Sequence, residues 1–229
     1  MDDVIYERQK SLPLSIPKAV AVVGCGGVGS WTAYFLALAG VEELWLFDSD
    51  TISAHNLNRI PLPADTVGKS KSLAVKGLIE SIRPQCRVLA FGDFTPKLAG
   101  QLQMEAAVRY VIATTDTLRS RQITARWAAE HHIPYGEAAA EGDTGSATGC
   151  PADWQTEMEN HPGYASVPVW IAPCAQAALL ICNYVVHGAL MEDRTIRCGW
   201  SPSEGITLFD SQVEIEEVEV VEETDALNR

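Results

Sequence analysis

A glycine-rich turn near the start of the chain has the residue types and the spacing of a phosphate cradle. The segment GCGGVGS, residues 24–30, follows an apolar run and places Gly24, Gly26 and Gly29 at the spacing Gly-x-Gly-x-x-Gly, with Gly27 between them. Glycine permits a tight turn and close approach of the backbone, and the helix that follows offers unpaired N–H groups to an anion. A turn that is merely tight would need the same glycines, so this spacing alone does not identify the ligand.

Polar residues follow the next expected strand, at residues 43–47. Asp48 stands where this strand ends, and a carboxylate at that place can accept hydrogen bonds from ribose hydroxyls. Asp50 follows two residues later, and Asn56 lies in the same polar loop. The turn and Asp48 together are also typical of nicotinamide-dependent dehydrogenases, so further residues are needed to separate the two kinds of nucleotide.

Three cations close to these residues favour a triphosphate. Arg59, Lys69 and Lys71 lie within a short span, although Lys69 taken alone is interpreted as a surface charge. A triphosphate needs such neutralisation, the more so as pyrophosphate leaves. Asp50 and Asp116 are carboxylates near strand ends that suit Mg²⁺ or the ribose, and the alternative for Asp116 is an N-cap of the next helix. We therefore expect ATP and Mg²⁺ as ligands.

Alternating strands and helices position these residues. The pattern predicts strands at 18–24, 43–47, 86–91, 110–113 and 133–135, and helices at 29–39, 69–82, 95–106 and 118–131. This alternation favours an α/β fold with a Rossmann-like, mostly parallel sheet and helices on both faces. Ligands of such sheets bind beyond the carboxyl ends of the strands, where Gly24, Asp48 and Asp116 fall.

The pattern changes after residue 135. We expect a long crossover loop at 140–172, an apolar helix at 175–190 and C-terminal antiparallel strands at 195–199 and 206–209. Residues 1–210 are predicted to form a single ATP-binding domain. The acidic segment 211–229 is interpreted as either an edge strand or a solvated tail.

Composition limits the class of protein. The 229 residues carry a formal net charge of −13, which argues against non-specific binding of nucleic acid. No apolar run is long enough to span a membrane, and the acidic start lacks a signal-peptide pattern, so we expect a cytoplasmic protein. The six cysteines form no CxxC pair, so no structural zinc site is expected.

Four segments together resemble a known family. GCGGVGS (24–30), LFDSDTISAHNLNR (46–59), VGKSK (67–71) and TTDTLRSR (114–121) are similar, in order and spacing, to the ThiF/MoeB/HesA family, the bacterial relatives of ubiquitin-activating enzymes. The resemblance covers about residues 18–140. It implies a homodimer that adenylates the C-terminal carboxylate of a small β-grasp carrier protein ending in Gly-Gly, with release of pyrophosphate.

The resemblance also implies roles for individual residues. Asp48 would hold the ribose, and Asn56, Arg59 and Lys71 would hold the phosphates. Asp116 would hold Mg²⁺. The chain departs from the family where Thr117 replaces the usual asparagine after this aspartate.

Arg8 and Cys174 are candidates of a different kind. Arg8, in IYERQ, resembles an arginine that reaches into the ATP site of the partner subunit in this family. Pro173-Cys174 resembles the neighbourhood of the family's cysteine, and a helix N-terminus there would lower the thiol pKa and favour a nucleophile. The alternative for Cys174 is a small buried residue of an apolar helix. Cys150 is a weaker candidate nucleophile.

Three other functions are consistent with parts of the sequence. Relatives adenylate a modified tRNA base or the C-terminus of a short peptide, and the acidic net charge disfavours tRNA. A non-catalytic nucleotide-binding scaffold in a heterodimer is disfavoured by the presence of Arg59, Lys71 and Asp116. A nicotinamide dehydrogenase is disfavoured by the cluster of cations.

Overall fold

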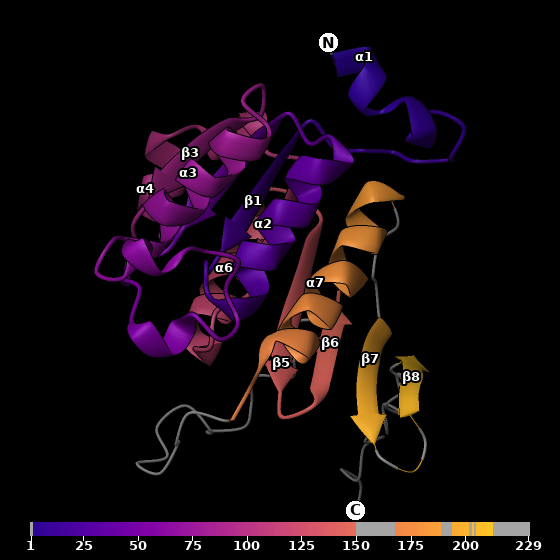
Figure 1. The fold of residues 1–229 in the computed structure, drawn as a ribbon. Helices are drawn as coiled ribbons and strands as arrows, with labels where there is room; N and C mark the ends of the chain where they lie inside the picture. The colour runs from indigo at the N-terminus through magenta and orange to yellow at the C-terminus, as the bar shows by residue number, and fades with distance from the viewer. Residues whose placement is uncertain (1, 150–167, 189–193, 202, 204, 213–229) are drawn as a thin grey trace, which may run out of the picture.

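The strands of the protein form one eight-stranded sheet in the order β3-β2-β1-β4-β5-β6-β7-β8 (Figure 1). A computed structural model describes residues 2–149, 168–188, 194–201, 203 and 205–212. The strands are β1 Ala19–Val23, β2 Glu43–Phe47, β3 Arg87–Phe91, β4 Tyr110–Ala113, β5 Tyr135–Glu141, β6 Thr144–Thr148, β7 Arg194–Ser201 and β8 Gly205–Gln212. Strands β1 to β5 pair in parallel, and β5 to β8 pair with one another antiparallel.

Helices cover both faces of this sheet. The α-helices are α1 Asp2–Ile5, α2 Gly27–Ala39, α3 Lys71–Ile82, α4 Pro96–Gln101, α5 Met104–Ala107, α6 Leu118–Glu130 and α7 Ile171–Val186. The 3-10 helices are η1 Glu7–Gln9, η2 Ala54–Asn56 and η3 Ala64–Thr66. One buried cluster joins the sheet to α2, α3 and α7, and the other joins it to α4, α5 and α6.

Strand β1 is apolar at every position because both of its faces are covered. In β1, Val20 and Val22 belong to the cluster under α2, whereas Ala21 and Val23 belong to the cluster on the other face. Alternate side chains of a strand point to opposite faces, so a continuous apolar run is what a two-sided strand requires. Each fully buried valine stabilises the fold by roughly 1.5–3 kcal/mol.

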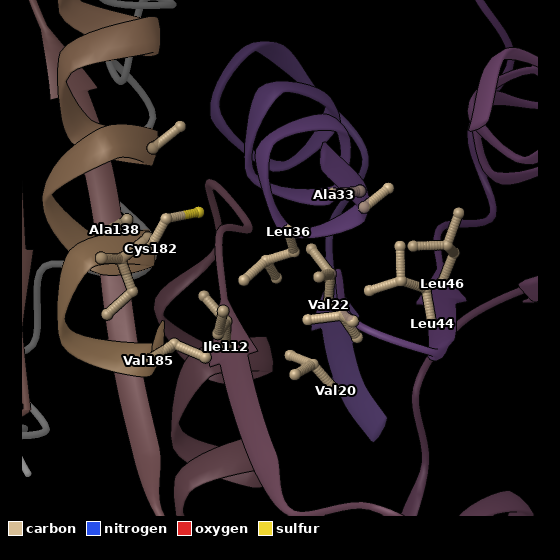
Figure 2. Packing of buried hydrophobic residues seen from close by; sticks show 14 of the residues in the cluster. Val20, Val22, Ala33, Leu36, Leu44, Leu46, Ile112, Ala138, Cys182 and Val185 are labelled. Atoms are coloured by element: carbon tan, nitrogen blue, oxygen red, sulfur yellow. The ribbon is translucent and has the colours of Figure 1, made fainter. Parts of the chain in front are cut away.

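Helix α2 lies beside α7 on the same face of the sheet and carries the glycine turn at its start (Figure 1). Figure 2 shows Leu36 of α2 among Val22, Ile112 and Val185, which come from two strands and from α7. The thiol of Cys182 on α7 donates to the carbonyl oxygen of Thr32 at 3.6 Å. The packing of α7 against α2 therefore connects the C-terminal part of the chain to the helix that follows the turn.

The predicted α/β fold is confirmed, with two local corrections. The helix expected at 95–106 is broken into α4 and α5, because Gln103 adopts a left-handed backbone with φ of 51°. Part of the segment expected as a loop at 140–172 forms the end of β5 and all of β6. Residues 150–167 and the tail after residue 212 lie outside the described residues.

None of the helices within the described ranges combines the length and the apolarity that a membrane span requires.

Candidate active site

The glycine turn is built by close contacts that only glycine allows. Gly24 has φ of +99°, and a Cβ there would lie 2.9 Å from the carbonyl carbon of Thr114. A Cβ on Gly29 would overlap the carbonyl oxygen of Gly24. Among the described residues, no acceptor bonds the backbone N–H groups of Gly26 and Gly27. These donors, at the start of the 13-residue helix α2, are what a phosphate group requires.

Asp48 fastens the turn to the end of β2. Its Oδ2 accepts the backbone N–H of Cys25 at 2.7 Å, and its Oδ1 accepts the backbone N–H of Asp50 at 2.8 Å. Burial raises the pKa of Asp48 above its ordinary value, an effect that the two backbone donors and the nearby Lys71 oppose. Each carboxylate oxygen retains a second lone pair, so Asp48 can still accept a hydrogen bond from a ribose hydroxyl.

Lys71 is the first residue of α3 and is joined to the loop after β2. Its Nζ is 2.7 Å from Oδ2 of Asp50, and its backbone N–H donates to the carbonyl oxygen of Asp50 at 2.9 Å. The side chain of Lys71 is 15% exposed, whereas that of Asp50 is 71% exposed. Lys69 instead pairs with Asp65 at 3.5 Å on the surface, as expected of a surface charge.

The side chain of Arg59 lies directly against the turn. Its Cγ and Cδ are 3.2 Å from the position that a Cβ on Gly27 would take. Its Nη1 donates to the carbonyl oxygen of His55 at 2.8 Å and to Oδ1 of Asn58 at 2.9 Å. The indole of Trp31 donates to the carbonyl oxygen of Arg59 at 3.0 Å. The guanidinium is thereby held beside the turn, while its Nε and Nη2 bond no other described residue and can donate to phosphate oxygens.

Asn56 supports the loop that carries Arg59. Its side chain is buried at 7% exposure, and its Oδ1 accepts the backbone N–H of Ser53 at 2.9 Å. The two residues form a reciprocal cap around η2. This contact gives Asn56 a structural part in the loop, and the contact with phosphate that was expected of it stays a prediction.

Asp116 lies in the loop after β4, beside the turn. Thr114 connects the two, because its Oγ1 donates to the carbonyl oxygen of Gly24 at 2.8 Å. Asp116 is exposed and bonds no other described residue. The N-cap of α6 is Thr117, which forms no side-chain capping bond, so the interpretation of Asp116 as the N-cap is wrong.

The carboxylate of Asp116 is therefore available to a cation. Within the described ranges no group of three or more His, Cys, Asp or Glu side chains is placed to hold a metal ion. Mg²⁺ is commonly bound by one or two carboxylates together with waters and substrate phosphates. The arrangement fits that mode, with Asp116 as the protein ligand and a nucleotide in the turn supplying the others.

Cys174 lies in the first turn of α7 and contacts the glycine turn. Its Sγ is 2.7 Å from the position that a Cβ on Gly27 would take, and the residue is 2% exposed. Burial raises the pKa of the thiol to about 11, although the Arg59 guanidinium opposes that effect. The lowered pKa expected from a helix N-terminus is therefore wrong for this conformation, and Cys150 lies outside the described residues.

Arg8 lies at the far end of α2 from the turn. The neighbouring Gln9 donates from Nε2 to the carbonyl oxygen of Ala39 at 2.7 Å, at the last residue of that helix. A helix rises by about 1.5 Å per residue, so the two ends of α2 are roughly 18 Å apart. Figure 1 also shows the N-terminal segment at the opposite end of α2 from the loops of the site. Arg8 does not join the site of its own subunit.

Two residues of the site were missed by sequence reasoning. Thr114 locks the turn as described, and Ser72 donates from Oγ to the carbonyl oxygens of Phe91 at 2.9 Å and Asp48 at 3.2 Å. Ser72 is 2% exposed. In the sequence, Thr114 was recognisable as a hydroxyl residue just after a strand, and Ser72 as a hydroxyl residue on the buried face of a helix.

Comparison with known proteins gives the family. The sequence model of the ThiF family matches residues 4–167 of the 229 in this chain, a range that contains every element of the site except α7. The chain belongs to the ThiF family. This match confirms the family that the four sequence segments indicated.

Curated relatives of this ThiF-family chain include two kinds of protein. The tRNA threonylcarbamoyladenosine dehydratase of Escherichia coli K12 is 36% identical over 128 residues, covering 55% of this chain and 47% of that protein. Ubiquitin-like modifier-activating enzyme 5 of Drosophila virilis is 44% identical over 83 residues, covering 36% of this chain and 19% of that protein. The chain thus spans less than half the length of these relatives.

Solved structures share the fold over most of the chain. MccB of Escherichia coli, in its structure with succinimide, aligns with a TM-score of 0.69 over 93% of this chain and 67% of that one, at 17% identity. PaaA aligns with a TM-score of 0.67 over 93% of this chain and 68% of that one, at 20% identity. At such low identity these likenesses show the fold alone.

Proposed function

We propose that this ThiF-family chain is an ATP-dependent adenylyltransferase that acts on the C-terminal carboxylate of a small β-grasp carrier protein ending in Gly-Gly. The observation that carries the proposal is the placement of Arg59 against a turn whose N–H groups lack acceptors, with the free carboxylate of Asp116 on the loop beside it. Unpaired N–H groups, a cation and an exposed carboxylate at one edge of the sheet thus support the proposal.

In the proposed reaction an oxygen of the carrier carboxylate attacks the α-phosphorus of ATP. The bond between that phosphorus and the oxygen bridging to the β-phosphate breaks, and pyrophosphate leaves with the electron pair. The N–H groups of the turn bind phosphate oxygens, and Arg59 neutralises the charge that develops on them. Asp48 orients the ribose. Mg²⁺, held by Asp116, would supply further positive charge to the phosphates.

Lys71 supports the same chemistry because its ammonium can exchange its present partner, Asp50, for a phosphate oxygen. It is paired with Asp50, whose side chain is 71% exposed. Asp50 is the exposed partner of the pair, whereas the side chain of Lys71 is only 15% exposed, so water can hydrate the Asp50 carboxylate when the ammonium leaves it. Transfer of the ammonium from Asp50 to a phosphate oxygen therefore costs little, and the pair keeps Lys71 extended at the edge of the site until the nucleotide arrives.

We propose a homodimer in which Arg8 of each subunit completes the site of the other. The position of Arg8 at the far end of α2 supports this proposal, because the arginine cannot reach the turn within its own subunit. We also propose a cytoplasmic location, which is consistent with the five free thiols among the described residues.

A second candidate acceptor is a modified base of tRNA. The 36% identity over 128 residues to tRNA threonylcarbamoyladenosine dehydratase favours it. The net charge of −13 disfavours it, since binding of a phosphate backbone requires a basic surface. Arg59, Lys71 and Asp116 give the site what catalysis requires and so disfavour a non-catalytic scaffold.

An ATP–pyrophosphate exchange assay with a panel of acceptors tests the proposal. We expect exchange in the presence of a carrier ending in Gly-Gly, and none when the final glycine is deleted. Exchange that depends instead on tRNA carrying a carboxylate-bearing base would replace the carrier with the second candidate. The absence of exchange with every acceptor would overturn adenylation as the function.

A further inference from the structure

A carboxylate is buried in β5, where the surrounding positions are small and apolar. Glu137 is 3% exposed and stands in the strand sequence YGEAAAE. An ionised carboxylate is costly to bury unless it is paired and hydrogen-bonded. In the parallel pairing of β4 with β5, Glu137 lies opposite Ala113, the residue just before the loop that carries Asp116. None of the roles described so far uses this group.

Each oxygen of Glu137 has its own partner. The hydroxyl of Tyr135, two residues earlier on the same face of β5, donates to Oε1 at 2.7 Å. Nη1 of Arg121, on α6, is 3.4 Å from Oε2. The tyrosine hydroxyl is also 3.4 Å from the carbonyl oxygen of Arg121. Burial raises the pKa of Glu137, and both partners oppose that effect.

Arg121 joins this buried pair to the loop of the active site. Its Nε donates to the carbonyl oxygen of Thr115 at 2.7 Å, the residue just before Asp116. The side chain is 21% exposed, so much of its guanidinium is removed from water. The planar guanidinium can bond Glu137 and Thr115 at once because its donors point in fixed directions. Thr114, the residue before Thr115, is in turn fixed to the glycine turn.

We propose that Tyr135 and Glu137 act through Arg121 as positioning residues for Asp116. The buried carboxylate fixes the guanidinium, the guanidinium fixes the carbonyl of Thr115, and the direction of the Asp116 side chain follows. This inference rests on the proposed function, in which Asp116 holds the metal of the bound nucleotide. Groups that orient a metal ligand in this way commonly change metal affinity by about 10–100-fold when they are removed.

The test measures the contribution of Mg²⁺ to nucleotide binding rather than turnover. A fluorescent ATP analogue is titrated into the full chain in Mg²⁺ and again in EDTA, and the ratio of the two dissociation constants gives the metal dependence. Arg121→Lys keeps the charge but cannot bridge both partners. We expect it to reduce the metal dependence on the order of tenfold, while binding in EDTA stays near the wild-type value.

A matched control comes from another arginine–glutamate pair. Arg87 on β3 is 2.9 Å from Glu43 and lies far along the sheet from Asp116, with a side chain 68% exposed. Arg87→Lys should leave the metal dependence unchanged. Tyr135→Phe, which keeps the ring and removes only the hydroxyl, should reduce the metal dependence in the same direction as Arg121→Lys and by less.

A double variant separates positioning from general loss of structure. If Arg121 acts through Asp116, Arg121→Lys should change the metal dependence no further once Asp116→Ala is present. A metal dependence that stays at the wild-type value in Arg121→Lys, with only a lower unfolding temperature, would overturn the inference and leave the proposed function standing. A wild-type chain that binds the analogue in neither buffer would overturn both.

Discussion

Two regions of this protein differ in how they are built: the nucleotide region, as we name the part from β1 to β5 that we propose binds ATP, and the C-terminal region after residue 167. Between β1 and β5, polar groups sit at the ends of strands and are connected by hydrogen bonds across loops that are distant in sequence, such as Thr114 to Gly24. After residue 167 the described chain is mostly apolar, and its exposed residues include Trp200, Ile206 and Leu208 on β7 and β8. The ThiF family model ends where the second region begins.

The apolar residues of the C-terminal region lie on neighbouring strands. MccB shares the fold over 93% of the chain at 17% identity. Trp200 and Ile206 are paired across β7 and β8, and Cys198 is paired with Leu208, which puts the apolar side chains on one face of the hairpin. We therefore predict that the nucleotide region performs the chemistry and that this face contributes to the choice of acceptor.

The largest effect is expected in the nucleotide region. Asp116→Ala should lower the rate of ATP–pyrophosphate exchange by about 10²–10³-fold, since removal of one preorganised group of this kind costs about 2.7–4 kcal/mol in the transition state. Asp65→Ala is the matched control, because Asp65 is an exposed carboxylate paired with a surface lysine. Near-normal exchange in Asp116→Ala, measured on folded protein, would remove the residue from the site.

The glycine turn should be intolerant of a single methyl group. Gly29→Ala places a Cβ on the carbonyl oxygen of Gly24, so we expect the free energy of unfolding to fall by about 3 kcal/mol or more. Gly77→Ala, in the middle of α3 with no heavy atom within 4 Å of the new Cβ, should instead raise it by roughly 0.4–1 kcal/mol. Urea denaturation of both variants measures the contrast, and equal stabilities would refute the account of the turn.

A substitution in the C-terminal region should leave nucleotide binding intact. Trp200 is 51% exposed, so Trp200→Ser should change the free energy of unfolding by no more than about 0.5 kcal/mol. Loss of a tryptophan anchor commonly weakens an interface on the order of tenfold or more, so the acceptor KM in the exchange assay should rise by about that factor. An unchanged KM would show that Trp200 does not contribute to the choice of acceptor. Weaker ATP binding in Trp200→Ser would show that the C-terminal region also contributes to nucleotide binding.

Complementation of two inactive variants should recover part of the activity. In an equal mixture of Arg8→Ala and Lys71→Ala subunits, half of the dimers combine one subunit of each kind, and one of the two sites in such a dimer is intact. We therefore expect about a quarter of the wild-type exchange rate after the subunits mix. No recovery, or a monomer in sedimentation, would argue against the contribution of Arg8 from the partner.

The smallest effect is expected at Cys174, where α7 of the C-terminal region contacts the glycine turn. Because burial raises the pKa of Cys174 to about 11, the thiol is protonated near neutral pH, and its alkylation should accelerate about tenfold per pH unit up to that value. Cys174→Ala should leave pyrophosphate exchange unchanged. If the same variant blocked transfer to the carrier at full stability, Cys174 would be a nucleophile that becomes exposed in another conformation.

Local spacing was enough to predict where the polar groups between β1 and β5 lie, because each of them belongs to a short segment of the sequence. The turn at Gly24, the strand end at Asp48 and the cation at Arg59 each follow from a short motif. What the motifs could not predict depends on contacts between distant elements. Glu137 is understandable only once β5 lies beside α6, and the thiol pKa of Cys174 depends on burial against α2 rather than on its place at a helix start.

Analysis of the products of ATP tests the central claim most directly. Attack at the α-phosphorus converts ATP to AMP and pyrophosphate, whereas ordinary hydrolysis of the terminal phosphate yields ADP and phosphate. With wild-type protein, Mg²⁺ and a carrier ending in Gly-Gly, we expect pyrophosphate to form together with AMP joined to the carrier. ADP as the nucleotide product would contradict adenylation by this chain.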